Sequence, residues 1–575
     1  MKELMLGNKA IARGLYEAGV KYISSYPGTP STEITEEAAE FSEMYAEWAP
    51  NEKVALESAL GASLAGARSF TAMKHVGLNV AADPLFTSAY TGVNGGVVIC
   101  VADDPAMHSS QNEQDSRHYA RAAKLPMLEP SDSGECLAFT RLAYEISEKY
   151  DTPVLLRTCT RVAHSQSLVE LGPRQEKPLN EYVKNPAKYV MNPGFGFKRH
   201  FAVEDRLKEL ARFSETSSMN RAEINDTSIG FVCAGSCYEY VKEAFPSASV
   251  FKVGMSFPMP IESIRAFASR VEKLYVVEEL DGVFENELRA AGIRVDGGKD
   301  IFGFIGELSQ SRVAEAMGLA PKETARFEEP VPARPPVMCA GCPHRGVFYV
   351  LSKLKLTVLG DIGCYTLGAS APLSAVDSVV CMGASVSMLH GFNTVRPEGA
   401  NKAVAVIGDS TFLHSGITAL TDIAYNRSIS TVLILDNSNT GMTGHQQNPA
   451  TGYTLRMQAV PPVSLEKVCE AVGIRRVRSV DPGDLKALEA CIKEELQADE
   501  PSVIICRRPC MLLKYVKPKP ALKVDTAACR ACRSCMRLGC PAIRFESGKA
   551  VIDATQCVGC GLCAQTCAFG AIKEA

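Results

Sequence analysis

Eight of the 21 cysteines in this chain lie in two runs between Cys529 and Cys567. The first run has the spacing C-x2-C-x2-C-x4-C, and the second has C-x2-C-x2-C-x3-C. Three cysteines separated by two residues can wrap one corner of a cubane iron–sulfur cluster, while the fourth projects toward another cluster. In a chain that we expect to be cytosolic, such clustering favours metal over disulfides.

The pairing typical of this motif is crossed, so that each run lends its last cysteine to the other cluster. We therefore predict two [4Fe–4S] clusters in a C-terminal α+β domain that resembles a bacterial two-cluster ferredoxin. Two structural zinc sites are the alternative, but zinc seldom uses three consecutive C-x2-C steps with a crossed fourth ligand. The extra residue in the first run leaves that cluster's type open. The predicted ligand sets are Cys529, Cys532, Cys535 and Cys567 for one cluster, and Cys557, Cys560, Cys563 and Cys540 for the other.

The residues before this tail alternate apolar, strand-like runs with helical stretches. This βαβ pattern predicts an α/β protein with several doubly wound parallel-sheet domains. Residues 173–226 are rich in Pro, Asn and Lys and predict a linker or an insert, while the Pro-rich, charged run 322–337 predicts a boundary. The predicted domains are 1–172, 227–320, 338–516 and 521–575. Strands are predicted within 20–27, 95–104, 152–160, 228–235, 272–279, 376–383, 402–410, 430–437 and 501–509.

Charge and hydropathy exclude several function classes. The net charge of −4 gives no reason to expect nucleic acid or an anionic membrane as partner. Neither a signal-peptide core nor a run of ~20 apolar residues is present, so we expect a cytoplasmic protein without a membrane span. Scattered cysteines in apolar or helical contexts are expected to be buried and inert. They are Cys100, Cys136, Cys159, Cys233, Cys237, Cys381, Cys469 and Cys491.

A candidate metal and phosphate site lies in the third α/β unit. Gly408-Asp409-Ser410 ends an apolar strand and opens a helix, and the next strand delivers Asn437. Ligands of open parallel sheets collect at the carboxyl ends of strands. An Asp and an Asn oxygen there can hold Mg²⁺ together with diphosphate oxygens, and the helix N-terminus adds backbone donors. Taken alone, the G-D-S run could equally be an ordinary strand-to-helix turn.

The loop that follows favours the metal site. G-D-x followed by Asn resembles the thiamine diphosphate (TPP) signature, and T-G-M-T-G-H-Q resembles a loop of the 2-oxoacid:ferredoxin oxidoreductases. The resemblance implies that Asp409, Asn437 and the backbone carbonyl of Asn439 ligate Mg²⁺, with Gly441 and Thr443 in the cofactor-binding loop. Ser410 departs from the usual Gly, which we expect to be tolerated because Asp409 supplies the charge.

A second part of the cofactor site is predicted in the first unit. TPP needs a glutamic acid that hydrogen-bonds its aminopyrimidine ring, and N-E-K-V-A-L-E-S-A-L-G offers Glu52 and Glu57. The run resembles the N-E-x-x-A-x-x-x-A-x-G segment of TPP decarboxylases, which selects Glu52 as the catalytic residue. The alternative is an exposed first-turn Glu favoured by the helix dipole.

Y-P-G-T-P-S-T-E-I resembles a segment of the same oxidoreductases in which the Thr faces substrate and cofactor, here Thr29. The alternative is that Thr29 caps the following helix. Lys74 and His75 match the family's loop after the catalytic helix. We expect most of four histidines (His75, His344, His414 and His445) to be structural. No residue clearly matches the family arginine that binds the substrate carboxylate, and Arg117 is a candidate.

A third cluster is an open possibility. The family holds a cluster near TPP with a C-x-G-C, a G-C and a late P-C, and the matching residues are Cys339, Cys342, Cys364 and Cys510. By spacing alone, the first pair could bind zinc or be inert. Pro343-His344 departs from the usual next residue, which puts this site in doubt.

The order of these parts resembles the large (alpha) subunits of the indolepyruvate:ferredoxin oxidoreductases over essentially the whole chain. The resemblance implies that an arylpyruvate and CoA are converted into an aryl-acetyl-CoA and CO₂, with electrons passed to an external ferredoxin. It also implies a smaller beta subunit in a heterodimer that pairs as a heterotetramer. The alternatives are an enzyme for pyruvate or 2-oxoglutarate, or an electron-transfer subunit with an inactive TPP site. The loop position that Met442 occupies is commonly polar in the pyruvate enzymes, so the methionine here hints at an apolar substrate.

Overall fold

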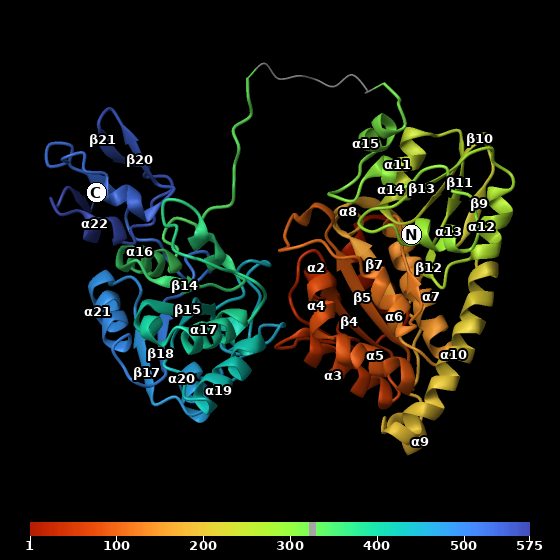
Figure 1. The fold of residues 1–575 in the computed structure, drawn as a ribbon, viewed down its shortest axis with the longest axis horizontal. Helices are drawn as coiled ribbons and strands as arrows, with labels where there is room; N and C mark the ends of the chain where they lie inside the picture. Colours follow the sequence, from red (N-terminus) through yellow and green to blue (C-terminus); the bar gives the residue numbers. More distant parts are fainter. Residues whose placement is uncertain (321–328, 575) are drawn as a thin grey trace. The chain divides into compact units, whose positions relative to one another are not determined.

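The computed structural model describes residues 1–320 and 329–574. The chain divides into two compact units, Met1–Arg326 and Phe327–Ala575 (Figure 1). Both units are built on sheets with mostly parallel strands, so the predicted α/β class is confirmed. No helix within the described ranges has the length and apolar content needed to cross a membrane.

A seven-stranded sheet forms the centre of the first unit, in the order β12-β6-β7-β5-β4-β2-β3. Its strands pair in parallel except for β12 against β6. The central strands are buried along their whole length, as expected for a parallel sheet covered on both faces. The strands are β2 (Tyr22–Ser25), β3 (Tyr45–Trp48), β4 (Ser69–Lys74), β5 (Val97–Asp103), β6 (Met127–Leu128), β7 (Val154–Cys159) and β12 (Met255–Phe257).

Helices and one antiparallel pair of strands from distant parts of the sequence accompany this sheet. The antiparallel pair is β1 (Lys2–Leu6) with β8 (Gln166–Glu170). The helices are α1 (Gly7–Glu17), α2 (Thr32–Ala38), α3 (Glu52–Leu64), α4 (His75–Val80), α5 (Ala82–Thr91), α6 (Arg117–Ala123), α7 (Ser133–Tyr150) and α8 (Thr160–His164), with a 3-10 turn, η1 (Pro105–Met107).

A second, four-stranded sheet follows in the same unit, in the order β13-β10-β11-β9. Strand β12 belongs to this part of the sequence but pairs with β6 of the first sheet, so the two parts share a sheet edge. The strands are β9 (Arg221–Glu223), β10 (Asp226–Cys233), β11 (Ala248–Lys252) and β13 (Leu274–Val277). The helices are α11 (Ser236–Ala244), α12 (Ile261–Ala268), α13 (Val283–Ala290), α14 (Lys299–Phe302) and α15 (Gln310–Ala316).

The segment 173–226, predicted as a linker or insert, is largely helical in its second half. It holds the short α9 (Pro186–Tyr189) and the 24-residue α10 (Pro193–Thr216). Asn192 caps α10 by accepting from the Phe195 N–H, and Pro193 fits the first turn. The long helix packs on α5 and reaches α12, so it joins the two sheets (Figure 1). Its buried residues Val203, Arg206, Leu210 and Ser214 recur every three or four positions.

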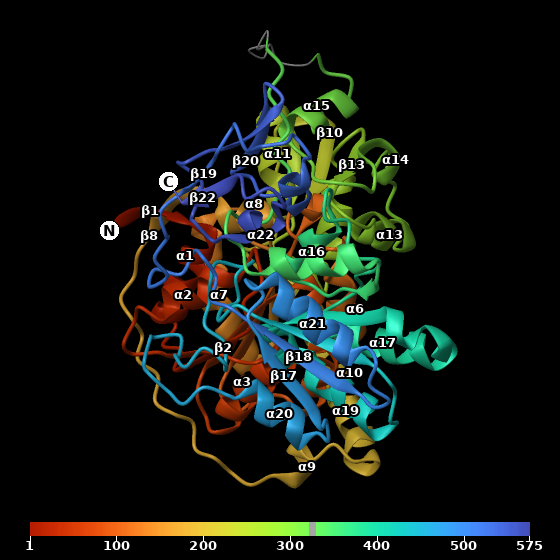
Figure 2. The same cartoon turned by 90° about the vertical axis from the view of Figure 1, so that its left-hand side faces the viewer.

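The second unit has a five-stranded parallel sheet in the order β14-β15-β16-β18-β17. The strands are β14 (Thr357–Leu359), β15 (Ala403–Gly408), β16 (Thr431–Asp436), β17 (Arg476–Val480) and β18 (Ser502–Arg507). Figure 2 shows α20 and α21 beside β17 and β18. The helices are α16 (His344–Leu354), α17 (Ala384–Val395), α18 (Asp409–Thr411), α19 (Ile417–Tyr425), α20 (Leu465–Ala471) and α21 (Leu485–Glu495), with η2 (Cys364–Ala369), η3 (Pro397–Lys402) and η4 (Phe412–Gly416).

The prediction of a strand within residues 376–383 is wrong. Only one bridge, between Leu359 and Ser378, forms there. The Asp377 carboxylate accepts a hydrogen bond from the Val358 N–H at 2.7 Å, which ties the segment to the end of β14 before it leaves the sheet. The apolar run therefore lacks a second partner strand, which its own residue pattern could not reveal.

The cysteine-rich tail is packed into the core of the second unit. Tail residues such as Leu522, Leu538 and Ile572 share one apolar cluster with Val347 and Leu351 of α16. The tail consists of two antiparallel pairs and two short helices. These are β19 (Leu522–Val524) with β22 (Ile572–Glu574), β20 (Ile543–Glu546) with β21 (Lys549–Ile552), η5 (Ser534–Leu538) and α22 (Leu562–Thr566).

Candidate cofactor site and cysteine clusters

Glu52 is a buried residue at the first position of α3. Asn51 caps this helix by accepting from the Val54 N–H at 2.9 Å, which leaves Glu52 to turn inward. Its side chain lies against Gly77, where a Cβ atom would approach the Glu52 Oε1 to 2.6 Å. Only glycine at position 77 therefore leaves room for this carboxylate. The exposed first-turn alternative does not describe Glu52, which is 4% exposed.

Glu57, the other candidate on α3, is exposed and ion-paired with Lys53 one turn earlier. Two helical positions with the same side chain thus have opposite environments. Residues Ala55 and Ala59 lie on the buried face with Glu52, where their small size allows α3 to pack closely on β2 and β4.

The loop that carries Thr29 lies beside Lys74. A Cβ atom on Gly28 would be 3.4 Å from the Lys74 side chain. Thr29 itself is half-buried and does not cap the following helix, because α2 begins at Thr32 with Ser31 in the cap position. The Ser31 hydroxyl donates instead to the Gly28 carbonyl oxygen at 2.8 Å, which closes the turn.

Lys74 and His75 end β4 and begin α4. The Lys74 ammonium donates to the Ser109 carbonyl oxygen at 2.7 Å, and burial lowers its pKa, against the charges of Asp104 and Glu52. His75 is buried, with its Nε2 at 3.1 Å from the Asn112 carbonyl oxygen and its Nδ1 without a partner. Burial lowers the pKa of His75 as well.

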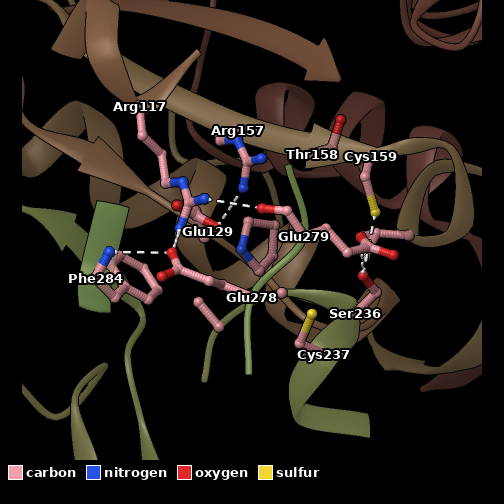
Figure 3. Close-up of a pocket in the computed structure, with 14 residues that line it drawn as sticks. Arg117, Glu129, Arg157, Thr158, Cys159, Ser236, Cys237, Glu278, Glu279 and Phe284 are labelled. Atoms are coloured by element: carbon pink, nitrogen blue, oxygen red, sulfur yellow. Dashed lines mark hydrogen bonds and ion pairs between the residues drawn. The ribbon is translucent and has the colours of Figure 1, made fainter. Parts of the chain in front are cut away.

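Arg117 does not stand free to bind a substrate carboxylate. It points toward Glu278 in the pocket of Figure 3, with Nη1 at 2.6 Å from the Glu278 carboxylate. Its other nitrogens bond the Asp115 carboxylate and the backbone carbonyls of Glu279 and Asp281. Every nitrogen of this guanidinium group is thus already paired. The candidate role of Arg117 in binding the substrate carboxylate is therefore wrong. Only the contacts in the folded chain could show this.

The pocket around Arg117 has a volume of about 370 Å³ and lies between the two sheets of the first unit. Arg157 on its wall bonds Asp103 and Glu129. Opposite them, the Glu279 carboxylate accepts from the Leu308 N–H at 2.8 Å and from the Ser236 hydroxyl at 3.2 Å (Figure 3). Among the residues that the structure describes, no cationic side chain pairs with the Glu279 carboxylate, and burial raises its pKa to about 7.

This raised pKa predicts a pH-dependent stability. Folded Glu279 holds its proton up to about pH 7, whereas the unfolded side chain releases it near 4.5, so folding loses stability as pH rises through that window. The loss amounts to about 3 kcal/mol above the folded pKa. We expect Glu279→Gln to lose less stability than the parent between pH 5 and pH 8, measured by urea unfolding of the full chain. The exposed Glu262→Gln is the matched control, and equal pH profiles for parent and Glu279→Gln would contradict the assignment.

The candidate metal site lies at the carboxyl edge of the second unit's sheet. Parallel pairing sets Gly408 of β15 opposite Leu435 of β16, so Asp409 and Asn437 leave the sheet next to each other. Asp409 is 2% exposed, and its Oδ2 accepts from the Asn448 amide at 3.1 Å. Burial, with a contribution from Asp436, raises the pKa of Asp409 to about 7.

Three polar groups converge there, from Asp409, Asn437 and Asn439. The inward-facing side-chain atom of Asn437 lies 2.8 Å from the Asn439 carbonyl oxygen and 3.1 Å from the Asp409 Oδ1. If this atom is the amide oxygen, three oxygens meet at the spacing that neighbouring ligands have around an octahedral Mg²⁺. If it is the nitrogen, it donates to both oxygens and closes the site without a metal. The donor set therefore fits Mg²⁺.

The Asn439 side chain is a second feature that suggests a ligand at this site. Its side chain is 2% exposed, yet neither its amide oxygen nor its amide nitrogen has a hydrogen-bond partner. Buried amides are normally satisfied. A polar ligand beside the metal site, such as a diphosphate, would satisfy it.

His344, one of the four histidines that we mostly expected to be structural, lies in this site. It is fully buried on α16, and its Nε2 lies 3.4 Å from the Asn437 amide nitrogen. Burial lowers the pKa of His344 to about 4, so Nε2 keeps its lone pair and can accept from that amide. Such a bond turns the Asn437 oxygen toward Asp409. The clue in the sequence was the H that follows C-x2-C-P.

The loop after Asn439 is held by its own side chains. Thr443 donates to the Gln446 side chain at 2.6 Å, and Gln446 donates back to the Thr443 carbonyl oxygen. Gly441 is required to be small, because a Cβ there would lie 2.9 Å from the Asn439 side-chain oxygen. Met442 between them is 48% exposed, so its side chain is available to a ligand.

Gly408 and Ser410 frame Asp409. A Cβ on Gly408 would come within 2.6 Å of the Tyr365 ring, which explains a glycine at the strand end. The Tyr365 hydroxyl donates to the Ile362 carbonyl oxygen at 2.6 Å and contacts the Thr411 hydroxyl. Ser410 accepts from the Thr440 hydroxyl at 2.9 Å. The serine in place of the family's glycine thus ties α18 to the following loop.

The four cysteines matched to a third cluster, here called the loop site (Cys339, Cys342, Cys364 and Cys510), gather beside this edge. The Cys510 N–H donates to the Asn437 carbonyl oxygen at 2.9 Å. A Cβ on Gly441 would be 3.4 Å from the Cys364 sulfur. Burial raises the pKa of Cys364 to about 11, and the neighbouring thiols Cys510 and Cys339 add to that rise.

In the tail, four cysteines surround one cavity of about 390 Å³, here called the cavity site. They are Cys540, Cys557, Cys560 and Cys563. The other tail set, here called the exposed site, consists of Cys529, Cys532, Cys535 and Cys567, whose members act electrostatically on Cys535. Cys532 lies at the surface. Both groupings have the crossed composition expected from the spacing, and their ligation stays a prediction.

The loop site and the cavity site share a wall. Ala340 and Gly341, between the first two loop-site cysteines, line the tail cavity together with Arg345. Gly341 needs to be small, because a Cβ there would lie 2.3 Å from the Val558 side chain. Across residues 1–320 and 329–574, no three His, Cys, Asp or Glu side chains converge closely enough for a single metal ion. What the tail cysteines surround is a cavity.

The other cysteines follow the expectation with one exception. Burial raises the pKa of the thiols at Cys100, Cys233 and Cys469, as expected for inert residues. Cys381 is exposed, so the expectation that it is buried is wrong. It lies in the segment that was predicted as a strand and that leaves the sheet instead.

Three protein-family models match this chain. Residues 13–223 match the family described as pyruvate flavodoxin/ferredoxin oxidoreductase, thiamine diP-binding. Residues 361–506 match the thiamine pyrophosphate enzyme C-terminal TPP-binding domain. Residues 521–568 match the 4Fe-4S dicluster domain. TPP binding is thus supported by matches in both halves of the chain, and [4Fe–4S] binding by the match in the tail.

Some curated proteins are similar to this chain over nearly its full length. The indolepyruvate oxidoreductase subunit IorA of Archaeoglobus fulgidus is 39% identical, covering 100% of this chain and 98% of the relative. That of Thermococcus kodakarensis is 40% identical, covering 99% and 96%. A solved structure, the 2-oxoglutarate:ferredoxin oxidoreductase from Magnetococcus marinus, is 17% identical with a TM-score of 0.44, covering 55% of this chain and 64% of that chain.

Proposed function

Because the chain belongs to the family of IorA subunits of indolepyruvate oxidoreductases, we propose that it oxidises an arylpyruvate of the indolepyruvate or phenylpyruvate type. It is a TPP-dependent, ferredoxin-linked 2-oxoacid oxidoreductase. The observation that carries the substrate class is the identity of about 39% with IorA proteins over the full length.

The reaction balances as follows. An arylpyruvate anion and the CoA thiol give an aryl-acetyl-CoA thioester, CO₂, one proton and two electrons. The bond between the two carbonyl carbons breaks and a carbon–sulfur bond forms. Two ferredoxin molecules take the electrons one at a time, which iron–sulfur clusters can do.

We assign the metal to the carboxyl edge of the second unit's sheet. Asp409, Asn437 and the backbone carbonyl of Asn439 are the ligands of Mg²⁺, and His344 turns the Asn437 amide toward it. The convergence of three polar groups within 3.1 Å supports this assignment. Gly408, Ser410, Gly441 and Thr443 shape the loop that holds the diphosphate of TPP. When bound, TPP supplies an electron sink for decarboxylation.

Glu52 is assigned the proton-holding role toward the cofactor's pyrimidine ring. Its burial against Gly77 excludes water that would compete for that hydrogen bond. We assign Thr29 to contact with substrate or cofactor, because it is half-buried and, unlike Ser31, is not used to close the turn. Met442, half-exposed on the metal-site loop, suits an apolar substrate side chain.

Three [4Fe–4S] clusters form the electron path in this proposal. The loop site lies against the Asn437–Gly441 loop, the cavity site shares a wall with it, and the exposed site reaches the surface at Cys532. This order leads from the cofactor edge to a position that an external ferredoxin can reach. A smaller beta subunit of the IorB kind completes the enzyme as a heterodimer, paired into a heterotetramer, in the cytoplasm.

The substrate class is tested by anaerobic cluster bleaching. The enzyme with its smaller subunit is loaded with TPP and Mg²⁺ and mixed with indolepyruvate, phenylpyruvate, pyruvate or 2-oxoglutarate, with and without CoA. We expect the arylpyruvates to reduce the clusters at least tenfold faster than the other two acids. Faster reduction by pyruvate or 2-oxoglutarate would overturn the substrate assignment and leave the cofactor assignment standing.

A further inference from the structure

Arg345 is a buried cation whose charge no side chain of the described residues neutralises. It is the second residue of α16 and is 2% exposed. Within residues 1–320 and 329–574, its guanidinium donates only to the backbone carbonyl oxygens of Leu538, Met338 and Cys339, and its Nε has no partner there. Arg117 and Arg157, which are also buried, are by contrast held by carboxylates.

The carbonyl oxygens that Arg345 binds belong to both cysteine-bearing segments. Met338 and Cys339 begin the C-x2-C run of the loop site, and Leu538 lies two residues before Cys540 of the cavity site. Arg345 also lines the cavity itself. Its positive charge acts on the thiols of both Cys342 and Cys540, in each case favouring the thiolate.

A buried guanidinium that meets only neutral carbonyl groups is costly, because hydrogen bonds do not replace the lost hydration of a charge. A nearby anion would compensate that cost. A [4Fe–4S] cluster with its four thiolates is a net anion, and it becomes more anionic when it accepts an electron. The position of Arg345 beside two such sites matches that need.

We propose that Arg345 is the counter-charge shared by the loop-site and cavity-site clusters, and that it stabilises their reduced states. The proposal rests on the cluster assignments made above. A positive charge next to a cluster favours the form with one more electron, so Arg345 raises the reduction potential. Because it lies beside both sites, it also keeps the electron's transfer from the loop site to the cavity site nearly balanced in energy. Arg345 is thus a positioning residue for the electron path and takes no part in the chemistry at the substrate.

Potentiometric titration of the purified holoprotein tests this proposal. Clusters are reduced with dithionite and redox dyes and followed by electron paramagnetic resonance, without TPP or a 2-oxo acid. The variants are Arg345→Gln, which removes the charge, and Arg345→Lys, which keeps it but cannot span the same carbonyl groups. Arg537→Gln is the control, because Arg537 is also close to the tail cysteines in sequence but is exposed.

For Arg345→Gln we expect the ratio of reduced to oxidised cluster at a fixed potential to fall about tenfold for at least one cluster, a shift of about 59 mV. Arg345→Lys should stay within about threefold of the parent, and Arg537→Gln should not change. Unchanged ratios in Arg345→Gln with full iron content would refute the proposal. A Lys variant that shifts as far as the Gln variant would refute it too, because hydrogen bonding would then matter and charge would not.

If Arg345→Gln loses a cluster, its potentials cannot be compared with those of the parent, and Arg345→Lys provides the test. Full iron content and parental potentials in Arg345→Lys support the counter-charge, whereas loss of iron from both variants overturns it. Since dithionite supplies the electrons, the result does not depend on the substrate. If the substrate assignment fails but the shift in reduction potential of the Arg345 variants is observed, only the substrate assignment is refuted.

Discussion

Replacing Glu52 with Gln is expected to slow substrate-driven reduction of the clusters by roughly 10²- to 10⁴-fold, the range for loss of a proton-transferring side chain. Glutamine keeps the shape of the side chain but cannot hold the proton that the cofactor's pyrimidine ring requires. The residue is buried at the start of α3 against Gly77, so solvent has no easy route to replace it. The measurement is stopped-flow bleaching by an arylpyruvate, with TPP and Mg²⁺ present.

Two controls isolate the chemistry from the fold. Glu57→Gln changes the same residue type on the same helix but at an exposed position, and should leave the rate unchanged. Dithionite should reduce the clusters of Glu52→Gln as fast as those of the parent, because that route bypasses TPP. A Glu52→Gln enzyme that arylpyruvate reduces at the parental rate would show that another residue has this role.

Replacing Cys364 with Ser is expected to remove the loop-site cluster and with it about four iron atoms per chain. Cys364 lies against Gly441 of the metal-site loop and acts electrostatically with Cys339 and Cys510, so its loss opens one corner of the site. We also expect substrate-driven reduction of the two tail clusters to slow by at least 100-fold, because the path from the cofactor edge is interrupted. Iron analysis and stopped-flow spectroscopy measure the two effects.

Cys381→Ser is the matched control for this prediction, since Cys381 is an exposed thiol in the same sheet domain. It should retain full iron and full rate. Dithionite reduction of the tail clusters should survive in Cys364→Ser. If Cys364→Ser retains the parental iron content, the loop site binds no cluster through this residue, and electrons must reach the tail by another route.

Much of the sequence-based prediction depended on the local pattern of apolar and polar residues along the chain. The strands that end at Gly408 and Asp436 were predictable because a continuous apolar run bounded by polar residues is typical of a buried parallel strand. The run at 376–383 has a similar pattern but found no second partner strand. Helix α10 was missed because its two early glycines and many charges hide an apolar stripe that matters only where α5 and α12 pack against it.

The candidate site was predictable in its ligands but not in their environment. Asp409 and Asn437 follow neighbouring strands, and parallel pairing must bring such residues together. The role of His344 could not be inferred, because it depends on α16 lying beside Asn437. Arg117 shows the reverse error: a candidate for ligand binding turned out to be held by Asp115 and Glu278 from two different parts of the chain.

The sequence by itself determined which groups this protein can use: two cysteine runs of fixed spacing, a strand-ending Asp, a capped helix that begins with Glu. These are properties of neighbours along the chain, where covalent geometry sets the distances. Tertiary structure alone decided which of those groups are buried from water, which are paired with a partner and which contact two sites. Gly77 gives Glu52 its space, residues far apart in sequence gather the loop-site thiols, and Arg345 is left without a carboxylate between two cysteine sites. Burial and charge depend on what folds against a residue, and no local pattern records that.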